Sequence, residues 1–235
     1  AARADGTTGS LVEVNSETDF VARNDKFQAF VDAVAGLAAA AGGNIEALKA
    51  ADYPDAGHNV EAELANLVAT IGENLMLRRT AMLSVDAGIV GTYVHSATAP
   101  GLGRIGVIVG LESAADEAVL EPLAKQIAMH IAATAPEAVS IDSLDPASVE
   151  RERNILTEQA RGSGRPAEII EKMVEGRLGK FFQEAVLLEQ TWVHDGESKV
   201  AKIVEEAAGA AEAPIVVAGF VRFALGEGIE KDAQD

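Results

Sequence analysis

With 235 residues, 48% of them apolar, the chain is long enough for one large domain or two small ones with a buried core, which excludes intrinsic disorder as the main state. Its 19 Lys and Arg against 37 Asp and Glu give a formal net charge of −18, so we expect no direct binding to nucleic acid or to membranes. The absence of cysteine excludes disulfides and thiolate metal sites, and it is typical of a reducing compartment such as the cytosol or an organelle matrix.

The first part of the chain alternates apolar strands with amphipathic helices, a pattern that predicts an α+β fold. Asp25 and Gln28 predict a capping box at the start of the first helix, and Gly72 is expected to end a later one. The expected elements are a strand at 10–15, helices at about 27–42, 45–50 and 60–71, and a strand at 75–85. Together they form a first core domain, residues 1–85.

The following segment repeats this order of elements. Strands are expected at 91–95 and 105–111 and a helix at about 115–135. Residues 11–40 and 105–135 share the sequence of apolar strand, acidic loop and Ala-rich helix, which indicates a weak internal duplication. A second, related core domain is therefore expected in two parts, residues 86–143 and 191–235, the latter with a helix near 199–207 and a strand at 214–223.

Residues 144–190 differ from the rest because they are highly charged yet nearly neutral: positions 145–190 hold 7 basic and 9 acidic residues. Helical patterns at 146–160 and 166–186 are separated by Gly162-Ser163-Gly164. We predict an antiparallel helical hairpin that protrudes from the core.

Motifs for bound cofactors or metals are weak. The spacing G-x-G-x-x-G at residues 101–106 is followed by a strand rather than a helix, so a hairpin loop is expected and no cofactor. The four histidines lack ligand spacing, so no metal site is expected.

His130 lies beside an apolar helix stripe, where a packed or interface role is favoured over catalysis. An enzyme would have to use clustered carboxylates that an acidic chain acquires by chance: Glu13, Glu17, Asp19 and Asp25.

The loop after the first strand contains Phe20 and Val21 among polar residues, although loops normally face solvent. One interpretation packs Phe20 beneath the loop as a hydrophobic staple for the helix capped by Asp25. The other presents Phe20 as an exposed hot spot that inserts into a partner. The residues alone leave both open.

Residues 12–24, VEVNSETDFVARN, with FQAF at 27–30, resemble the signature of the elongation factor Ts family, the nucleotide exchange factors of elongation factor Tu in bacteria and organelles. The resemblance continues in the family's order through IGEN, YVH, GRIGVIV, AMHIAA, EKMVEGR, LLEQ and GFVRF, starting at residues 71, 93, 103, 128, 171, 187 and 219. It covers essentially the whole chain. Family members usually begin with a small three-helix domain that this sequence lacks, so we expect a shortened form.

The resemblance implies a translation factor that binds elongation factor Tu, GDP-bound and nucleotide-free, and promotes exchange of GDP for GTP without covalent chemistry of its own. In the family, the loop credited with disturbing the Mg²⁺ site of the partner corresponds to Thr18, Asp19, Phe20 and Val21. A second contact is expected around His130 and Val193, and the hairpin at 144–190 is expected to be a coiled coil. A bacterial cytoplasmic location follows, with an organelle matrix as the alternative.

Two hypotheses on mechanism remain in competition. In the first, Phe20 wedges into an apolar gap of the partner, Asp19 competes for a group that orders the metal or phosphate, and Thr18 and Val21 stiffen the loop. In the second, the chain is an adaptor or holdase-like binder that grips elongation factor Tu without exchange activity. Release of GDP separates the two.

Overall fold

The computed structural model of the protein describes residues 1–229, which fall into two compact units: residues 1–132 with those from 211 onward, and residues 133–210. Helices and antiparallel sheets confirm the predicted α+β class. The finer division at 1–85, 86–143, 144–190 and 191–235 remains a prediction, and its last six residues lie outside the described part. Within residues 1–229, no helix has both the length and the apolar character to cross a membrane.

The first sheet of the larger unit has the antiparallel order β1-β2-β3, formed by β1 (Ala2–Asp5), β2 (Thr8–Ser16) and β3 (Leu75–Ser84). The strand β1 was not predicted because its sequence, ARAD, has no alternation of large apolar residues. Its backbone pairs with β2 across a turn at Gly6, whose φ of 54° suits glycine. Hydrogen bonding, rather than hydrophobic patterning, therefore defines this strand.

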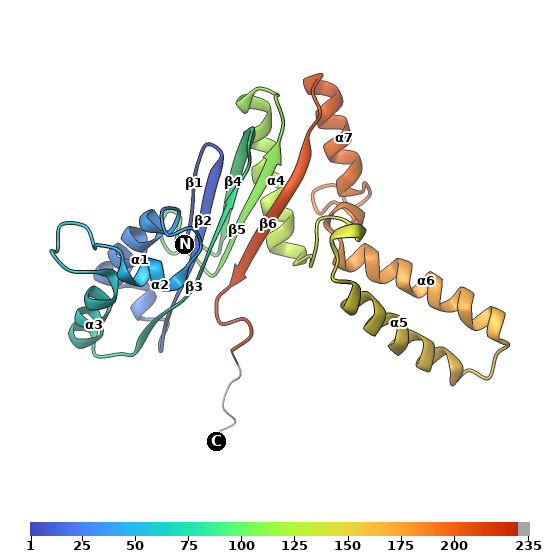
Figure 1. The fold of residues 1–235 in the computed structure, drawn as a ribbon, viewed down its shortest axis with the longest axis horizontal. Coiled ribbons are helices and arrows are strands. Elements are labelled where there is room, and N and C mark those ends of the chain that lie inside the picture. The colour runs from blue at the N-terminus through green and yellow to red at the C-terminus, as the bar shows by residue number, and fades with distance from the viewer. Residues whose placement is uncertain (230–235) are drawn as a thin grey trace. The chain divides into compact units, whose positions relative to one another are not determined.

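Helices cover one face of this sheet, as Figure 1 shows. They are η1 (Val21–Arg23), α1 (Asp25–Ala38), α2 (Ile45–Ala50) and α3 (Val60–Ile71). Val12 and Val14 of β2 point into a core shared with Phe30 and Val34 of α1, as expected for a strand whose alternate residues face the helices.

The start of α1 corrects one prediction. Asn24 is the capping residue: its backbone is extended, and its Oδ1 accepts hydrogen bonds from the N–H groups of Lys26 (2.9 Å) and Phe27 (3.2 Å). Asp25 already belongs to the helix, and Gln28 donates to the Ala22 carbonyl instead (2.9 Å). The predicted Asp25–Gln28 capping box is therefore wrong: the cap lies one residue earlier, at Asn24, and Gln28 does not return a hydrogen bond to it.

The second sheet of the larger unit has the same topology. It is formed in the order β4-β5-β6 by β4 (Gly88–His95), β5 (Ile105–Glu112) and β6 (Val216–Ala224). Its central strand is followed by α4 (Glu117–Thr134), as the central strand β2 is followed by α1. The proposed alignment of residues 11–40 with 105–135 thus superposes a central strand and its helix in both halves.

The two sheets pack face to face, because β1 and β2 contact β4 and β5 (Figure 1). Leu11 from the first sheet is buried with Val90 and Ile108 from the second. A Cβ at Gly9 would lie 2.4 Å from Cγ1 of Val90, so this close approach of the strands requires glycine.

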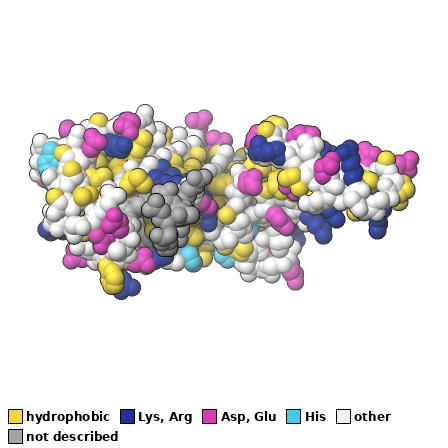
Figure 2. All heavy atoms as spheres, turned by 90° about the horizontal axis from the view of Figure 1, so that it is seen from below, with side chains coloured by type: hydrophobic (Ala, Val, Ile, Leu, Met, Phe, Trp, Pro, Cys, Tyr) yellow, Lys and Arg dark blue, Asp and Glu magenta, His cyan; other side chains and the backbone are white. Residues whose placement is uncertain are grey.

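The smaller unit contains the predicted helical hairpin. Its elements are η2 (Ile141–Ser143), α5 (Pro146–Arg161), α6 (Ala167–Ala185), η3 (Leu187–Glu189) and most of α7 (Val200–Ala211). α5 and α6 run antiparallel and bury Leu156 and Ala160 against Val174 and Leu178. Figure 2 shows basic and acidic side chains intermingled along the hairpin, as its near-neutral composition predicts. Coiled-coil geometry and protrusion from the core remain predictions.

Candidate functional site

The loop between β2 and η1 exposes a single large aromatic side chain. Phe20 is 88% exposed, whereas the next residue, Val21, is 4% exposed and belongs to the core beneath the helices. Phe20 therefore does not pack as a hydrophobic staple, and of the two interpretations the presented aromatic agrees with the structure. An exposed aromatic beside a buried anchor is the arrangement expected of a side chain available to a partner.

Polar contacts from two other loops hold the residues that precede Phe20. The carboxylate of Glu73 accepts two hydrogen bonds from Thr18, one from its backbone N–H (3.1 Å) and one from its hydroxyl (2.7 Å). Asp19 pairs with Arg104, whose Nη2 lies 2.8 Å from its Oδ1. Glu73 connects α3 to β3 and Arg104 directly precedes β5, so both halves of the larger unit contact the loop.

After Phe20 the chain enters a short 3₁₀ turn. The N–H of Arg23 donates to the Phe20 carbonyl (3.1 Å), and the N–H of Asn24 donates to that of Val21 (2.9 Å). This turn leads directly into the Asn24 cap of α1. The loop is thus anchored on its C-terminal side by core packing and helix capping.

A cavity of about 230 Å³ adjoins the loop. Asp19, Arg23 and Arg104 contribute polar groups to its wall, and Leu102 and Phe223 contribute apolar surface. Within residues 1–229 no three His, Asp or Glu side chains gather as ligands for a metal ion.

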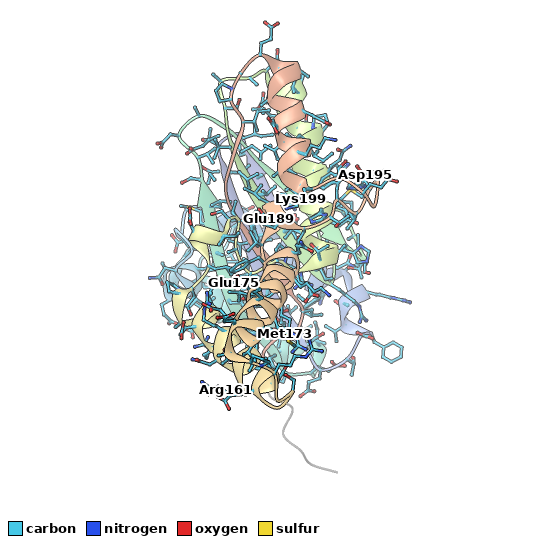
Figure 3. All side chains as sticks on the ribbon, turned by 90° about the vertical axis from the view of Figure 1, so that its right-hand side faces the viewer. Arg161, Met173, Glu175, Glu189, Asp195 and Lys199 are labelled. Atoms are coloured by element: carbon cyan, nitrogen blue, oxygen red, sulfur yellow. The ribbon has the colours of Figure 1, made fainter. Side chains whose placement is uncertain are left out.

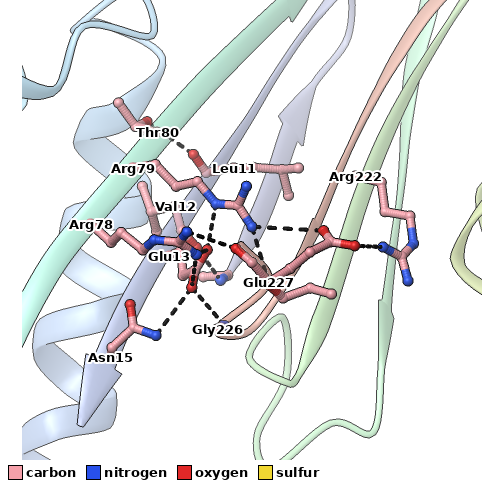
Figure 4. Close-up of polar contacts among 12 residues, drawn as sticks. Leu11, Val12, Glu13, Asn15, Arg78, Arg79, Thr80, Arg222, Gly226 and Glu227 are labelled. Atoms are coloured by element: carbon pink, nitrogen blue, oxygen red, sulfur yellow. Dashed lines mark hydrogen bonds and ion pairs between the residues drawn. The ribbon is translucent and has the colours of Figure 1, made fainter. Parts of the chain in front are cut away.

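A buried ionic cluster around Glu13 lies close to this loop, on β2, the strand that precedes the loop (Figure 4). Glu13 of β2, 4% exposed, accepts hydrogen bonds from Arg78 (3.0 Å), Arg79 (2.5 Å) and Asn15 (3.1 Å), and from the backbone N–H of Gly226 (2.8 Å). Burial acts to raise the pKa of Glu13, but these hydrogen bonds outweigh it and hold the pKa below its ordinary value of 4.5. Glu13 is therefore charged in the folded protein.

The cluster joins both sheets of the larger unit. Arg79 also donates to the carbonyl of Ala224 (3.1 Å), and its guanidinium lies 4.2 Å from the centre of the Phe223 ring, both on β6. Arg78 donates to the carbonyl of Glu227 (2.7 Å), in the turn after β6.

Glu13 was considered above only as a chance acidic residue, and its pairing role was missed. The adjacent pair Arg78-Arg79 in a strand was the available signal, because two arginines there need a buried or acidic partner.

The two other predicted contact residues lie in different units. His130, on α4 in the larger unit, has no exposed surface. Val193, in the smaller unit, is 44% exposed. The packed role left open for His130 agrees with its burial, and partner contact by either residue remains a prediction.

Val193 lies on a tight loop. The N–H groups of Glu197 and Ser198 donate to Asp195 (2.9 and 3.0 Å), and these hydrogen bonds hold the pKa of Asp195 below its ordinary value. The loop closes with an ion pair of 2.5 Å between Lys199 and Glu189, which lie near each other in Figure 3. These contacts close the loop that carries the exposed valine.

Comparison with known proteins supports the resemblance seen in the sequence. A family model described as Elongation factor TS matches residues 17–227. The elongation factor Ts of Rhodospirillum rubrum is 58% identical over 231 residues, covering 98% of this chain and 75% of the relative. That of Rhodospirillum centenum is 57% identical over 229 residues (97% and 75%), and that of Caulobacter vibrioides is 51% identical over 230 residues (98% and 73%). The matched region includes the exposed loop and the residues that hold it, and the chain therefore belongs to the elongation factor Ts family of translation elongation factors.

Proposed function

We propose that the protein binds elongation factor Tu, in its GDP-bound and nucleotide-free forms, and promotes replacement of GDP by GTP by disturbing the Mg²⁺ and phosphate site of that partner. The observation that carries this proposal is the exposure of Phe20 on a loop anchored at both ends. Membership of the elongation factor Ts family supplies the partner.

Nucleotide release needs no covalent chemistry. A GTPase holds its nucleotide through a phosphate-binding loop, a helix N-terminus and Mg²⁺. A protein that binds better to the form lacking these contacts shifts the population toward that form and so releases the nucleotide. The exposed loop can act in this way by contact alone.

Phe20 supplies the apolar part of the proposed contact. Full burial of a phenylalanine side chain contributes about 1.5 to 3 kcal/mol, which corresponds to roughly 10- to 150-fold in an equilibrium constant. Because Phe20 is 88% exposed in the free protein, nearly all of this energy is available to a partner.

Asp19 supplies the polar part. Its ion pair with Arg104 joins side chains that are 82% and 57% exposed. Exposed pairs contribute at most about 1 kcal/mol, so Asp19 can exchange Arg104 for a group of the partner at little cost. We propose that this group is one that orders the metal or phosphate of the nucleotide site.

We further propose a second contact with the partner through Val193, whose exposed side chain lies on the loop that Asp195 closes. His130 is buried in the larger unit, and its part in binding the partner stays a prediction. The relatives named above are bacterial, and we place the protein in the bacterial cytoplasm, where elongation factor Tu acts.

The experiment is stopped-flow release of a fluorescent GDP analogue from elongation factor Tu, with saturating wild-type protein or its Phe20→Ala variant. Wild type should accelerate release, and Phe20→Ala should lower the stimulated rate at least about tenfold, because the wedge is lost. The melting temperature should stay within about 2 °C of wild type, since an exposed side chain adds little to the core.

The matched control is Val119→Ala, which removes an exposed apolar side chain of α4 (39% exposed) and should release GDP like wild type. If wild type binds elongation factor Tu but leaves the release rate at its spontaneous value, the protein is an adaptor and the exchange proposal is wrong.

A further inference from the structure

Glu73 contacts the exposed loop through its whole carboxylate. Both of its carboxylate oxygens accept hydrogen bonds from one residue: Oε2 from the Thr18 backbone N–H (3.1 Å) and Oε1 from the Thr18 hydroxyl (2.7 Å). The two residues are 55 positions apart in the chain. A contact through both donors restrains the backbone of Thr18 as well as its side chain.

The register of the sheet explains why these residues meet. The antiparallel pairing of β2 with β3 ends at Ser16 opposite Leu75. Continuing that register by two residues on each strand places Thr18 opposite Glu73. There the Glu73 side chain takes the place of a backbone carbonyl as acceptor, so the first loop residues remain tied to the sheet although the strands have ended.

Glu73 itself starts from a defined backbone position. Gly72 ends α3 in the left-handed conformation, with a φ of 81°, and its N–H donates to the Val68 carbonyl (2.9 Å). Leu75, two residues after Glu73, is buried in the core. The short connection between helix and strand therefore fixes the backbone from which the Glu73 side chain extends to Thr18.

The exposed aromatic depends on such support because it has almost no packing of its own. Val21 anchors the loop on one side of Phe20 by burial. On the other side, Glu17 and Asp19 are exposed, and the Asp19–Arg104 pair is open to solvent and therefore weak. On that side the Ser16 hydroxyl donates locally to the Thr18 carbonyl (3.1 Å), and the Thr18–Glu73 contact ties the same residue to a segment that is distant in sequence.

We propose that Glu73 is a positioning residue that preorganises the loop and so presents Phe20 in a single orientation; the inference rests on the proposed function of this loop. A loop that is already ordered loses less conformational entropy on binding, so removal of the restraint weakens productive contact with the partner. A purely structural Glu73 would instead only stabilise the connection between α3 and β3.

The variants are Glu73→Ala, which removes both hydrogen bonds, and Glu73→Gln, whose single amide oxygen retains one acceptor. In the GDP-release assay, Glu73→Ala should raise the concentration for half-maximal acceleration about fivefold, and Glu73→Gln about twofold. The rate at saturation should stay within about twofold of wild type, because Phe20 is still present. This distinguishes positioning from the effect of Phe20→Ala, which lowers the saturating rate.

The second measurement requires no partner. Backbone ¹⁵N relaxation of the free protein should show increased picosecond-to-nanosecond motion at Asp19 and Phe20 in Glu73→Ala, with Glu73→Gln intermediate. Glu61→Ala is the control, because it removes the same charge from the exposed first turn of α3, at the opposite end of that helix.

Unchanged loop relaxation in Glu73→Ala would overturn the proposal. So would a variant whose loop is more mobile than that of wild type but that accelerates GDP release half-maximally at the same protein concentration. If wild type itself fails to release GDP, the proposed function is wrong, and the relaxation data still decide whether Glu73 orders the loop. If Glu73→Ala does not fold, Glu73→Gln carries both measurements.

Discussion

Glu13 places a negative charge in the interior of the larger unit, where an isolated carboxylate would be strongly destabilising. Its side chain is 2% exposed, yet it accepts hydrogen bonds from Arg78 and Arg79, which lie side by side on β3. The backbone N–H of Gly226 adds a donor from beyond β6. Charge neutralisation and hydrogen bonding together keep Glu13 ionised. Through these bonds the residue connects three segments that are distant in sequence: β2, β3 and the turn after β6.

Replacement of Glu13 by glutamine should lower the free energy of unfolding by about 3 kcal/mol, because the partly buried side chains of Arg78 and Arg79 lose their counter-charge. For a chain of this length we expect a fall in melting temperature of roughly 6 to 12 °C at pH 7, measured by calorimetry. Glu227→Gln is the control. Its side chain is 54% exposed, so it should change the melting temperature by only about 1 to 2 °C.

The stability difference should depend on pH in one direction. The folded pKa of Glu13 lies below its ordinary value of 4.5, so its ionisation stabilises the folded state above pH 4.5. This contribution is lost as the pH falls through the folded pKa. Wild type and Glu13→Gln should therefore converge as the pH falls from 4.5 through the folded pKa of Glu13. A constant difference from pH 7 to pH 3 would show that packing, not charge, is responsible.

At the scale of the element, the turn between α5 and α6 contains two glycines with different backbone requirements. Gly164 has a φ of 66°, which side chains rarely adopt, whereas Gly162 has a helical φ of −60°. A Cβ at Gly162 would meet only the Gln159 carbonyl, at an ordinary contact distance of 3.5 Å.

We therefore predict that Gly164→Ala destabilises the hairpin by about 1 to 2 kcal/mol through backbone strain. The paired variant Gly162→Ala should be neutral or stabilising by up to about 1 kcal/mol, because it reduces the entropy of the unfolded chain. Thermal unfolding followed by circular dichroism measures both. Equal effects of the two substitutions would contradict the role of the positive φ.

The elements that could be predicted from sequence are those with a strong period. The helix expected at 60–71 and the strand expected at 75–85 occupy nearly those residues, because burial of alternate or every third to fourth side chain leaves a local pattern. The strand β1 has no such pattern, and the cap of α1 depends on which of two adjacent polar residues, Asn24 or Asp25, has an extended backbone.

The candidate site was predictable in part for the same reason. Phe20 is conspicuous in a polar loop, so its position could be singled out locally. Its supports could not, because Glu73 and Arg104 are 55 and 85 residues away from the groups they bind. Pairings over such distances follow from sheet register and sheet packing, which periodicity within one segment does not encode.

At the scale of the larger unit, two halves of equal topology have different loops after their central strands. The loop after β2 exposes Phe20. The corresponding loop after β5 leads into α4, where the N–H of Ala118 donates to Asp116 (2.9 Å). In the same loop the Ser113 hydroxyl donates to the Pro214 carbonyl (2.7 Å). The loop of the first half thus exposes an aromatic side chain, whereas the loop of the second half forms hydrogen bonds within the unit. Arg104 of the second half also pairs with Asp19 in the loop of the first.

The proposed exchange activity has a thermodynamic consequence that involves the whole complex. If the protein weakens the binding of GDP to elongation factor Tu by some factor, GDP must weaken the binding of the protein by the same factor. Wild type should therefore bind nucleotide-free elongation factor Tu more tightly than the GDP-bound form. Phe20→Ala should reduce that ratio about tenfold, because the apolar surface of Phe20 is buried only where the nucleotide contacts have been released.

Titration calorimetry of wild type and Phe20→Ala against both forms of elongation factor Tu gives the four affinities that define this coupling. Val119→Ala should keep the wild-type ratio, since its exposed side chain lies on α4 outside the loop. An equal loss of affinity for both forms in Phe20→Ala would mean that Phe20 strengthens binding without discriminating between nucleotide states. A contact of that kind cannot drive release, because only a difference in affinity between two states shifts their populations.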